Sequence, residues 1–326
     1  MALVGLAPGG RFRKAGGVKP RSASWLVRLA LASLLAAPLA IGSPRAEAKR
    51  RPQPHELFRF SAGAALFAPP GVGPQGDVYV GTGDGYLHAL GPDGTFRWSY
   101  TVKGRIAAPA IEDGKTGRVF VATSEARLYA FEPDARLRWV FPLPVPPKSE
   151  LALTPQGTLL FVGKDDHLYG VTTSGALVLR LASPAARSGP AIMSDGRAAL
   201  VLDGSIATLK GYGFERALLP EPLSPGARLL LTADRSVFAC EDGKSRAIAA
   251  RPELALARDC VAPPVQASGF LAVAAANGDV RLVYPTGEPI VVQLGSLPQR
   301  PVWDAARRRL ILSTATGTVS VMEVTP

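Results

Sequence analysis

The clearest hydrophobic pattern in the chain is a set of short apolar runs separated by tight turns in residues 76–100. Val78–Gly81 and Tyr86–Leu90 have the length and the β-branched or aromatic composition of strands. The two turns between the runs contain glycine, which accepts the positive φ angles that tight turns require. Residues 95–100 alternate and end on an aromatic pair. The pattern therefore predicts three antiparallel strands in about 25 residues, most of one small sheet.

This unit recurs at intervals of about 40 residues. Residues 117–141 repeat the pattern of residues 76–100, and residues 157–181 repeat it again. The nine-residue spacing from Ala89 to Trp98 is kept in the second copy. A period near 40 with four short strands per unit is typical of a β-propeller blade. A single sheet cannot bury both of its faces, so we expect the units to stack around an axis.

The first copy resembles a known repeat, the pyrroloquinoline-quinone (PQQ)-type propeller repeat, V-Y-V-G-T-x-D-G-x-L-x-A-L-D-x-x-T-G-x-x-x-W. Twelve positions match: Val78, Tyr79, Val80, Gly81, Thr82, Asp84, Gly85, Leu87, Ala89, Leu90, Gly94 and Trp98. Gly91 departs from the usual Asp. The resemblance implies that the tryptophan docks between adjacent blades, a role that falls to Trp98 and Trp139, with Leu179 in the third copy.

The period divides the chain into seven units and leaves the last one short of a strand. The units are 61–103, 104–145, 146–184, 185–223, 224–263, 264–297 and 298–326. The missing strand is present at the other end, because His55–Ser61 resembles residues 94–99 and places Phe60 where the first unit has Trp98. We expect an all-β fold over residues 55–326, a seven-bladed propeller of four-stranded antiparallel blades closed by an N-terminal strand. Eight blades, the other frequent number in such repeats, is the alternative.

The N-terminal region has a different pattern, that of an export signal. The formal net charge is +11, and more than half of the excess lies in residues 1–48. A basic stretch, Arg11–Arg28, precedes the 14-residue apolar stretch Leu29–Gly42, and Ala46-Glu47-Ala48 supplies small residues before a cleavage point. We expect a signal peptide at 1–48, a short lead-in at 49–54 and a periplasmic or secreted mature chain. The apolar stretch is too short to span a bilayer, and no cysteine near it offers a lipid-attachment site.

Candidate chemistry is sparse. The three histidines lie in different units without metal-ligand spacing, so we expect no metal site, and no nucleophile or phosphate-binding motif appears. PQQ-dependent dehydrogenases, which share the repeat, have adjacent cysteines and calcium-binding acids. This chain has only Cys240 and Cys260, so we expect no cofactor and no enzymatic activity. The two cysteines fall in the expected second and fourth strands of unit five, about 9.6 Å apart. The sequence therefore leaves open whether they pair.

One charge pattern recurs from unit to unit. A base stands before the expected innermost strand at Arg105, Lys148, Arg187, Arg228 and Arg300. An acid stands in the turn after the second strand at Asp84, Glu125, Asp165, Asp166, Asp203, Asp242 and Asp279. Both sets are expected on the same rim of the propeller. They either form a charged mouth that binds a partner, with Asp84, Asp165 and Asp166 as the candidate acids, or neutralise each other between blades with little energetic effect.

These observations favour a monomeric scaffold that binds other proteins of the cell envelope. The basic residues form no long run, so nucleic acid is not an expected partner. In repeat type, the chain is similar to the propeller lipoprotein of the outer-membrane barrel assembly machinery, which implies envelope proteins as partners. The alternative is a small-ligand sensor or an enzyme that uses the rim, including a quinone-dependent dehydrogenase.

Overall fold

The computed structural model describes residues 53–224, 226–248 and 259–324. They belong to one compact unit, residues 51–326. The expected signal peptide, residues 1–48, lies outside the described residues. All regular elements in the described part are strands, and no helix there is long and apolar enough to cross a membrane.

The described strands form seven antiparallel sheets. Blade 1 contains β2 (Gly71–Val72), β3 (Val78–Gly81), β4 (Tyr86–Leu90) and β5 (Phe96–Thr101). Blade 2 contains β6 (Ile111–Glu112), β7 (Val119–Thr123), β8 (Arg127–Phe131) and β9 (Leu137–Pro142). Blade 3 contains β10 (Ala152–Leu153), β11 (Thr158–Val162), β12 (His167–Thr172) and β13 (Leu177–Ala182). Blade 4 contains β14 (Ala191–Ile192), β15 (Ala198–Leu202), β16 (Ser205–Lys210) and β17 (Gly213–Leu218).

The remaining three sheets come from the C-terminal part of the chain and one N-terminal strand. Blade 5 contains β18 (Arg228–Leu231), β19 (Val237–Glu241) and β20 (Lys244–Ala247). Blade 6 contains β21 (Val265–Ala267), β22 (Phe270–Ala274), β23 (Asp279–Val283) and β24 (Ile290–Gln293). Blade 7 contains β25 (Val302–Asp304), β26 (Arg309–Ser313) and β27 (Thr318–Glu323), completed by β1 (His55–Ser61).

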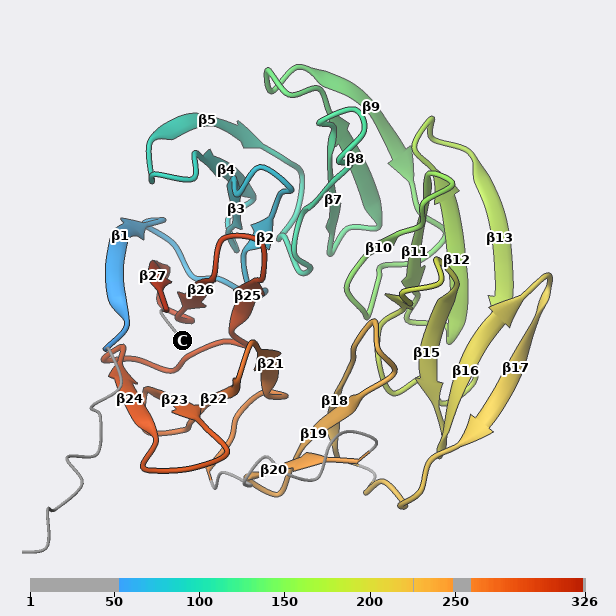
Figure 1. The fold of residues 1–326 in the computed structure, drawn as a ribbon. Coiled ribbons are helices and arrows are strands. Elements are labelled where there is room, and N and C mark those ends of the chain that lie inside the picture. The colour runs from blue at the N-terminus through green and yellow to red at the C-terminus, as the bar shows by residue number, and fades with distance from the viewer. Residues whose placement is uncertain (1–52, 225, 249–258, 325–326) are drawn as a thin grey trace, which may run out of the picture. The chain divides into compact units, whose positions relative to one another are not determined.

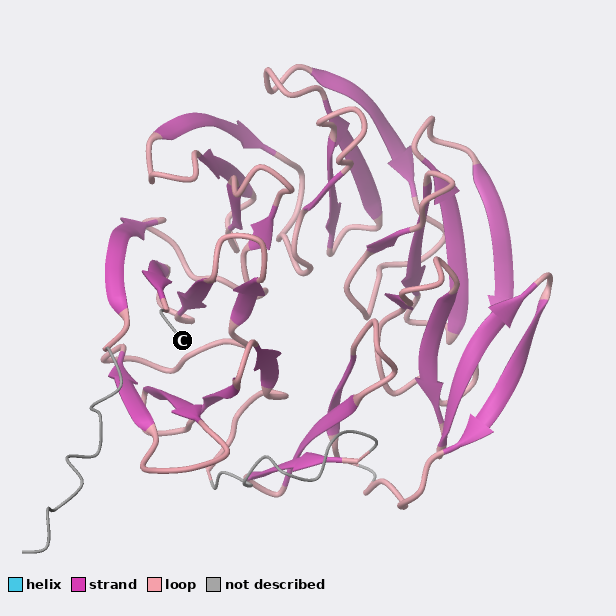
Figure 2. Ribbon diagram, in the orientation of Figure 1, coloured by secondary structure: helices cyan, strands magenta, loops and turns pink. Residues whose placement is uncertain are grey.

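The sheets follow one another around a ring, and strands such as β2, β21 and β25 lie nearest the axis, whereas β1, β5 and β13 lie on the outside (Figure 1). In blades 1 to 6 the described strands run outward in chain order, and in blade 7 β25, β26 and β27 do so and β1 follows as the outermost strand (Figure 2). Gly85 shows why the turns need glycine: its φ is +93°, and a Cβ atom there would lie 2.6 Å from the carbonyl oxygen of Val102. The expected seven-bladed β-propeller is confirmed.

The core consists of side chains packed between neighbouring sheets. The central strands β7, β11 and β22 are buried almost throughout, because each lies inside its sheet and both faces are covered by adjacent blades. The outermost strands β5 and β13 instead alternate between half-buried and exposed positions. The hydrophobic clusters accordingly join residues of two consecutive blades, as the stacking argument predicts.

The ring closes through the N-terminal strand, as expected. Strand β1 pairs antiparallel with β27, from His55 opposite Glu323 to Ser61 opposite Thr318. The sheet order β1-β27-β26-β25 makes β1 the outermost strand of blade 7 (Figure 1). Closure in this way covers the edge that β27 would otherwise expose.

Blade 5 corrects one expectation, because Cys260 does not lie in a fourth strand of that blade. It forms an isolated bridge with Ala275 of blade 6, and its N–H donates to the carbonyl of Gly243 in the β19–β20 turn. This position brings its Cα to 5.9 Å from that of Cys240, within disulfide reach. The two cysteines form a disulfide that ties blade 5 to the start of blade 6.

Candidate functional site

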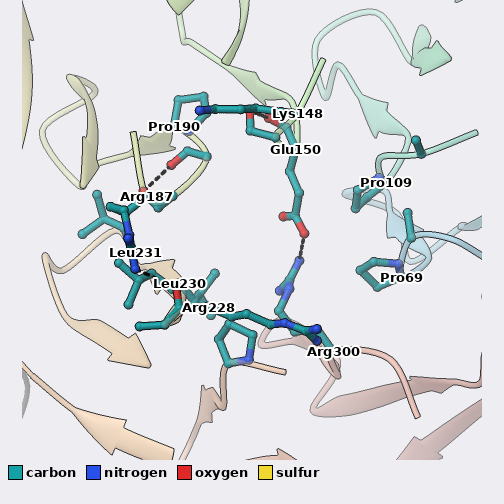
Figure 3. Close-up of a pocket in the computed structure, with 18 of the residues that line it drawn as sticks. Pro69, Pro109, Lys148, Glu150, Arg187, Pro190, Arg228, Leu230, Leu231 and Arg300 are labelled. Atoms are coloured by element: carbon teal, nitrogen blue, oxygen red, sulfur yellow. Dashed lines mark hydrogen bonds and ion pairs between the residues drawn. The ribbon is translucent and has the colours of Figure 1, made fainter. Parts of the chain in front are cut away.

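The segments that lead into the innermost strands meet at one end of the ring, here called the upper rim. They enclose a cavity of about 520 Å³ on the axis. Every blade contributes to its lining, in order Phe67, Pro109, Lys148, Arg187, Arg228, Pro263 and Arg300. Four of the five bases that the sequence pattern singled out therefore face one space (Figure 3). A cavity of this kind is a default binding-site hypothesis.

Two of these bases are positioned by the same local structure. The N–H of Lys148 donates to the carbonyl of Val162, and the following Ser149 Oγ accepts the N–H of Val162, each at 2.9 Å. In blade 4, Arg187 and Ser188 make the equivalent bonds to Val201 at 2.8 and 2.9 Å. The backbone and the serine together fix the segment against the second strand. Lys148 and Arg187, which precede these serines, therefore occupy equivalent positions in blades 3 and 4.

Arg105 does not line the cavity, although the sequence pattern grouped it with the other bases. It stands one residue before the bridge residue of its blade, Ile106, whereas Lys148 and Arg187 stand one residue after theirs. Its guanidinium carbon instead lies 4.4 Å from the centre of the Phe67 ring, a cation–π contact. Phe67 itself occupies the lining position in blade 1, one residue after the bridge residue Leu66.

The four lining bases differ in how their charge is compensated. Arg300 forms an ion pair across the cavity with Glu150, at 2.6 Å between Nη2 and Oε1 (Figure 3). Lys148 pairs with Asp166. Arg187 donates to the carbonyls of Ser224 and Ala227, at 2.5 and 3.4 Å, and Arg228 donates to the carbonyl of Val261 at 2.5 Å.

Carbonyl oxygens satisfy guanidinium donors without neutralising the charge. Arg187 and Arg228 have no carboxylate partner among the residues that the structure describes. The cavity therefore has an excess of positive charge, which favours an anionic group.

The candidate acids do not form a second ring around this cavity. Asp84 accepts a hydrogen bond from Thr82 Oγ1 at 2.5 Å within its own turn. Asp165 accepts the hydroxyl of Tyr169 at 2.7 Å and approaches His167 and Arg180. Burial acts to raise the pKa of Asp165, but these hydrogen bonds and charges outweigh it and the pKa lies below its usual value. Of the acids in these turns, only Asp166 pairs with a base of the cavity, Lys148.

Sequence reasoning missed Glu150, the acid that does face the cavity. It stands two residues after Lys148, outside the turn that supplies the other acids. The recurring bases could have pointed to Glu150, because an acid on the same inner segment as Lys148 is also close to the axis. No group of three or more histidine, cysteine or acidic side chains that could hold a metal ion occurs within the described ranges.

The upper rim also exposes two large apolar side chains beside the cavity. Phe67 is 53% exposed and Leu297 is 50% exposed. The chain segments that carry them are joined through Ala315. The N–H of Leu66 donates to the carbonyl of Ala315, and the N–H of Ala315 donates to the carbonyl of Leu297. Exposed apolar residues at the edge of a polar cavity are typical of a protein-binding surface.

The expected blade-docking residues lie between blades. The Trp98 ring is 6.1 Å from that of Tyr79 in its own blade and 6.2 Å from that of Phe131 in the next.

Trp139 packs into the hydrophobic cluster shared by blades 2 and 3, and its Nε1 donates to the carbonyl of Thr173 at 3.3 Å. Phe60 of β1 packs with residues of blades 7 and 1, including Val78, Val80 and Val319. These aromatic residues join sheets and do not line the upper-rim cavity.

Comparison with known proteins places this architecture in a family. The family model of the outer membrane protein assembly factor BamB matches residues 46–234. The chain is similar to the crystal structure of BamB from Moraxella catarrhalis, with 21% identity, 82% of this chain and 85% of that chain covered, and a TM-score of 0.57.

The chain is also similar to the β-propeller domain of Cps50 (Swd1) from Myceliophteria thermophila, with 11% identity, 83% and 100% coverage, and a TM-score of 0.64. At these identities the two structures show the fold alone. No curated protein matches the chain. The family model covers more than half of the chain and agrees with the repeat resemblance found in the sequence. This chain belongs to the family of outer membrane protein assembly factor BamB.

Proposed function

We propose that this chain is an exported, non-catalytic scaffold of the cell envelope that binds an acidic segment of a partner protein at its upper rim. Membership of the BamB family supports an envelope protein-interaction scaffold. The observation that carries the finer proposal is the axial cavity, in which Arg187 and Arg228 have only carbonyl partners among the described residues.

The partner segment should combine carboxylates with at least one apolar side chain. Carboxylates replace carbonyl contacts with charge-assisted hydrogen bonds, which are stronger. The apolar side chain covers Phe67 and Leu297, which are half exposed at the margin of the cavity. Aromatic and arginine side chains in such an arrangement are the residues that most often dominate binding energy at protein interfaces.

Site-specific photo-crosslinking in cells tests this proposal. A photoreactive residue at Leu297 should capture one discrete envelope protein, whereas the same residue at Leu218, which is 89% exposed on the outer strand of blade 4, should not. The double variant Arg187→Glu/Arg228→Glu should abolish the Leu297 product. Lys210→Glu/Arg216→Glu, which makes the same charge change on the outer strands of blade 4, should leave it intact.

The proposal fails if Leu297 and Leu218 give the same products, or if the Leu297 product survives charge reversal at the cavity. Export is tested on the same protein, since N-terminal sequencing of the envelope fraction should begin at Lys49. Intact Met1 protein in the cytoplasm would contradict it. The alternative enzymatic function is tested by adding PQQ and calcium and following alcohol-dependent dye reduction, for which we expect no activity.

A further inference from the structure

A second cavity lies at the opposite end of the strands, here called the lower rim, between blades 1 and 2. Its volume is about 470 Å³. Its walls come from β3 and the loop before it, from β5 and the turn before it, from β6 and from the turns of blade 2. The residues that matter chemically are Asp77, Tyr79, Arg97, Trp98 and Glu112. The upper-rim cavity shares no lining residue with it.

Asp77 lines this cavity, and one oxygen of its carboxylate is a buried acceptor without a partner among the described residues. The residue is 6% exposed. Its Oδ2 accepts a hydrogen bond from Nη1 of Arg97 at 2.8 Å, while its buried Oδ1 has no hydrogen-bond partner among the described residues. Buried polar atoms are rarely left unpaired, because the lost hydration is expensive. The carboxylate of Asp77 therefore lacks one hydrogen-bond donor in its surroundings.

Glu112 brings a second carboxylate to the same space. Its Oε2 accepts the hydroxyl of Tyr79 at 2.8 Å, and Tyr79 is 5% exposed. Gly73 makes this placement possible, because a Cβ atom at Gly73 would lie only 1.8 Å from Glu112 Oε2. The Glu112 carboxylate thus occupies space that a side chain at position 73 would fill.

The surroundings do not fully compensate these two negative charges. Burial raises the pKa of Asp77, although the charges of Arg97 and Arg307 act in the opposite direction. Burial also raises the pKa of Glu112, partly offset by the Tyr79 hydrogen bond, and the neighbouring Asp77 raises it further. Each carboxylate would be stabilised by an additional positive charge in the cavity. The cavity therefore favours a cation, although the chain as a whole has a net charge of +11.

We propose that the lower-rim cavity binds an alkylammonium group through Asp77 and Glu112. An ammonium is a compact charge with three donors and suits an unpaired carboxylate oxygen beside a second carboxylate. The rings of Tyr79 and Trp98, 6.1 Å apart at a tilt of 42°, supply aromatic surface for the alkyl chain and for a cation–π contact. The ammonium belongs either to a lysine side chain of a partner or to a free amine.

Titration of the mature full-length protein with simple amines tests the inference. The probes are N-α-acetyl-lysine amide, cadaverine and, as the uncharged control, N-α,N-ε-diacetyl-lysine amide. Calorimetry should give saturable binding of the two amines, and the tryptophan fluorescence of the protein, to which Trp98 contributes, should change with the same midpoint. The diacetylated control should not bind. Tighter binding of lysine amide identifies a lysine side chain as the natural ligand, and tighter binding of cadaverine identifies a free amine.

Three variants make the result specific. Glu112→Gln and Asp77→Asn should each weaken amine binding about tenfold or more, since each removes one charge-assisted contact. If Asp77→Asn fails to fold, Glu112→Gln decides, because its carboxylate is only partly buried. Glu125→Gln, at an exposed acid in the β7–β8 turn, should bind like wild type.

The inference is overturned if neither amine binds saturably, if the diacetylated probe binds equally well, or if Glu112→Gln leaves the affinity unchanged. It is independent of the function proposed for the upper rim. Arg187→Glu/Arg228→Glu should abolish partner capture there and leave amine binding at the lower rim unchanged.

Discussion

Removal of strand β1 should destabilise the propeller far more than removal of the residues before it. The strand pairs with β27 along its length, from His55 to Ser61. Phe58 and Phe60 project from it into the cluster that joins blade 7 to blade 1. A chain that starts at His55 keeps all of these contacts, whereas a chain that starts at Ala62 loses them and exposes the edge of β27.

The expected magnitude follows from these contacts. Complete burial of a phenylalanine contributes about 1.5–3 kcal/mol, and Phe58 and Phe60 are each partly buried, so together they contribute about 2–4 kcal/mol. Deletion also exposes Val319 and Val321, which are 0% and 1% exposed, and adds about 1–2 kcal/mol. The total, about 3–6 kcal/mol, is a large fraction of the 5–15 kcal/mol that is typical of folded domains.

Urea unfolding of chains that start at Lys49, His55 and Ala62 measures the effect. The first two should have the same midpoint, and the third should unfold at much lower urea and aggregate through the freed edge. The full-length double variant Phe58→Ala/Phe60→Ala should fall between them, because it loses side-chain packing and keeps the strand pairing. Equal midpoints for the chains that start at His55 and Ala62 would refute the closure argument.

Three further predictions concern packing, the disulfide and pH. Trp139→Ala should lower the free energy of unfolding by about 3 kcal/mol, because the ring bridges two blades; a melting temperature within about one degree of wild type would contradict this. Loss of the disulfide in Cys240→Ser/Cys260→Ser should cost about 3 kcal/mol by loop-closure entropy, and an unchanged urea midpoint would count against it. Since burial raises the pKa of Glu112 above its ordinary value of 4.5, its ionisation in the folded state lowers stability as the pH rises through that range. Glu112→Gln should therefore be more stable relative to wild type at pH 7 than at pH 4, and a pH-independent difference in urea midpoints would argue against a raised pKa of Glu112.

The fold was predictable wherever the repeat was well marked. The expected strands Val78–Gly81 and Tyr86–Leu90 have the same bounds in the structure, because glycine turns limit them on both sides. Strand β17 has no alternating apolar pattern that would mark its bounds in the sequence, because its residues are half-buried or exposed. The predicted position of Cys260, in a fourth strand of blade 5, was wrong because a short apolar run does not reveal whether it ends one blade or begins the next.

The site was predictable in part. Recurrence along the chain indicated that bases such as Lys148 and Arg187 share one rim, and the structure places them in one cavity. The partner of each base was not predictable, since the Arg300–Glu150 pair joins residues 150 positions apart across the axis. The lower-rim cavity was missed because Asp77 and Glu112 belong to different repeats, and only the stacking of blades 1 and 2 brings them together.

The central claim is that uncompensated positive charge in the upper-rim cavity binds an acidic segment of a partner. The most direct measurement is the affinity of the partner captured at Leu297 for wild type and for Arg187→Glu/Arg228→Glu, at low and high salt. We expect charge reversal to weaken binding about a hundredfold or more, since two charged contacts are lost, and wild-type binding to weaken as salt screens the charges. Lys210→Glu/Arg216→Glu should bind like wild type. An affinity unchanged by reversal at Arg187 and Arg228 and insensitive to salt would contradict the account.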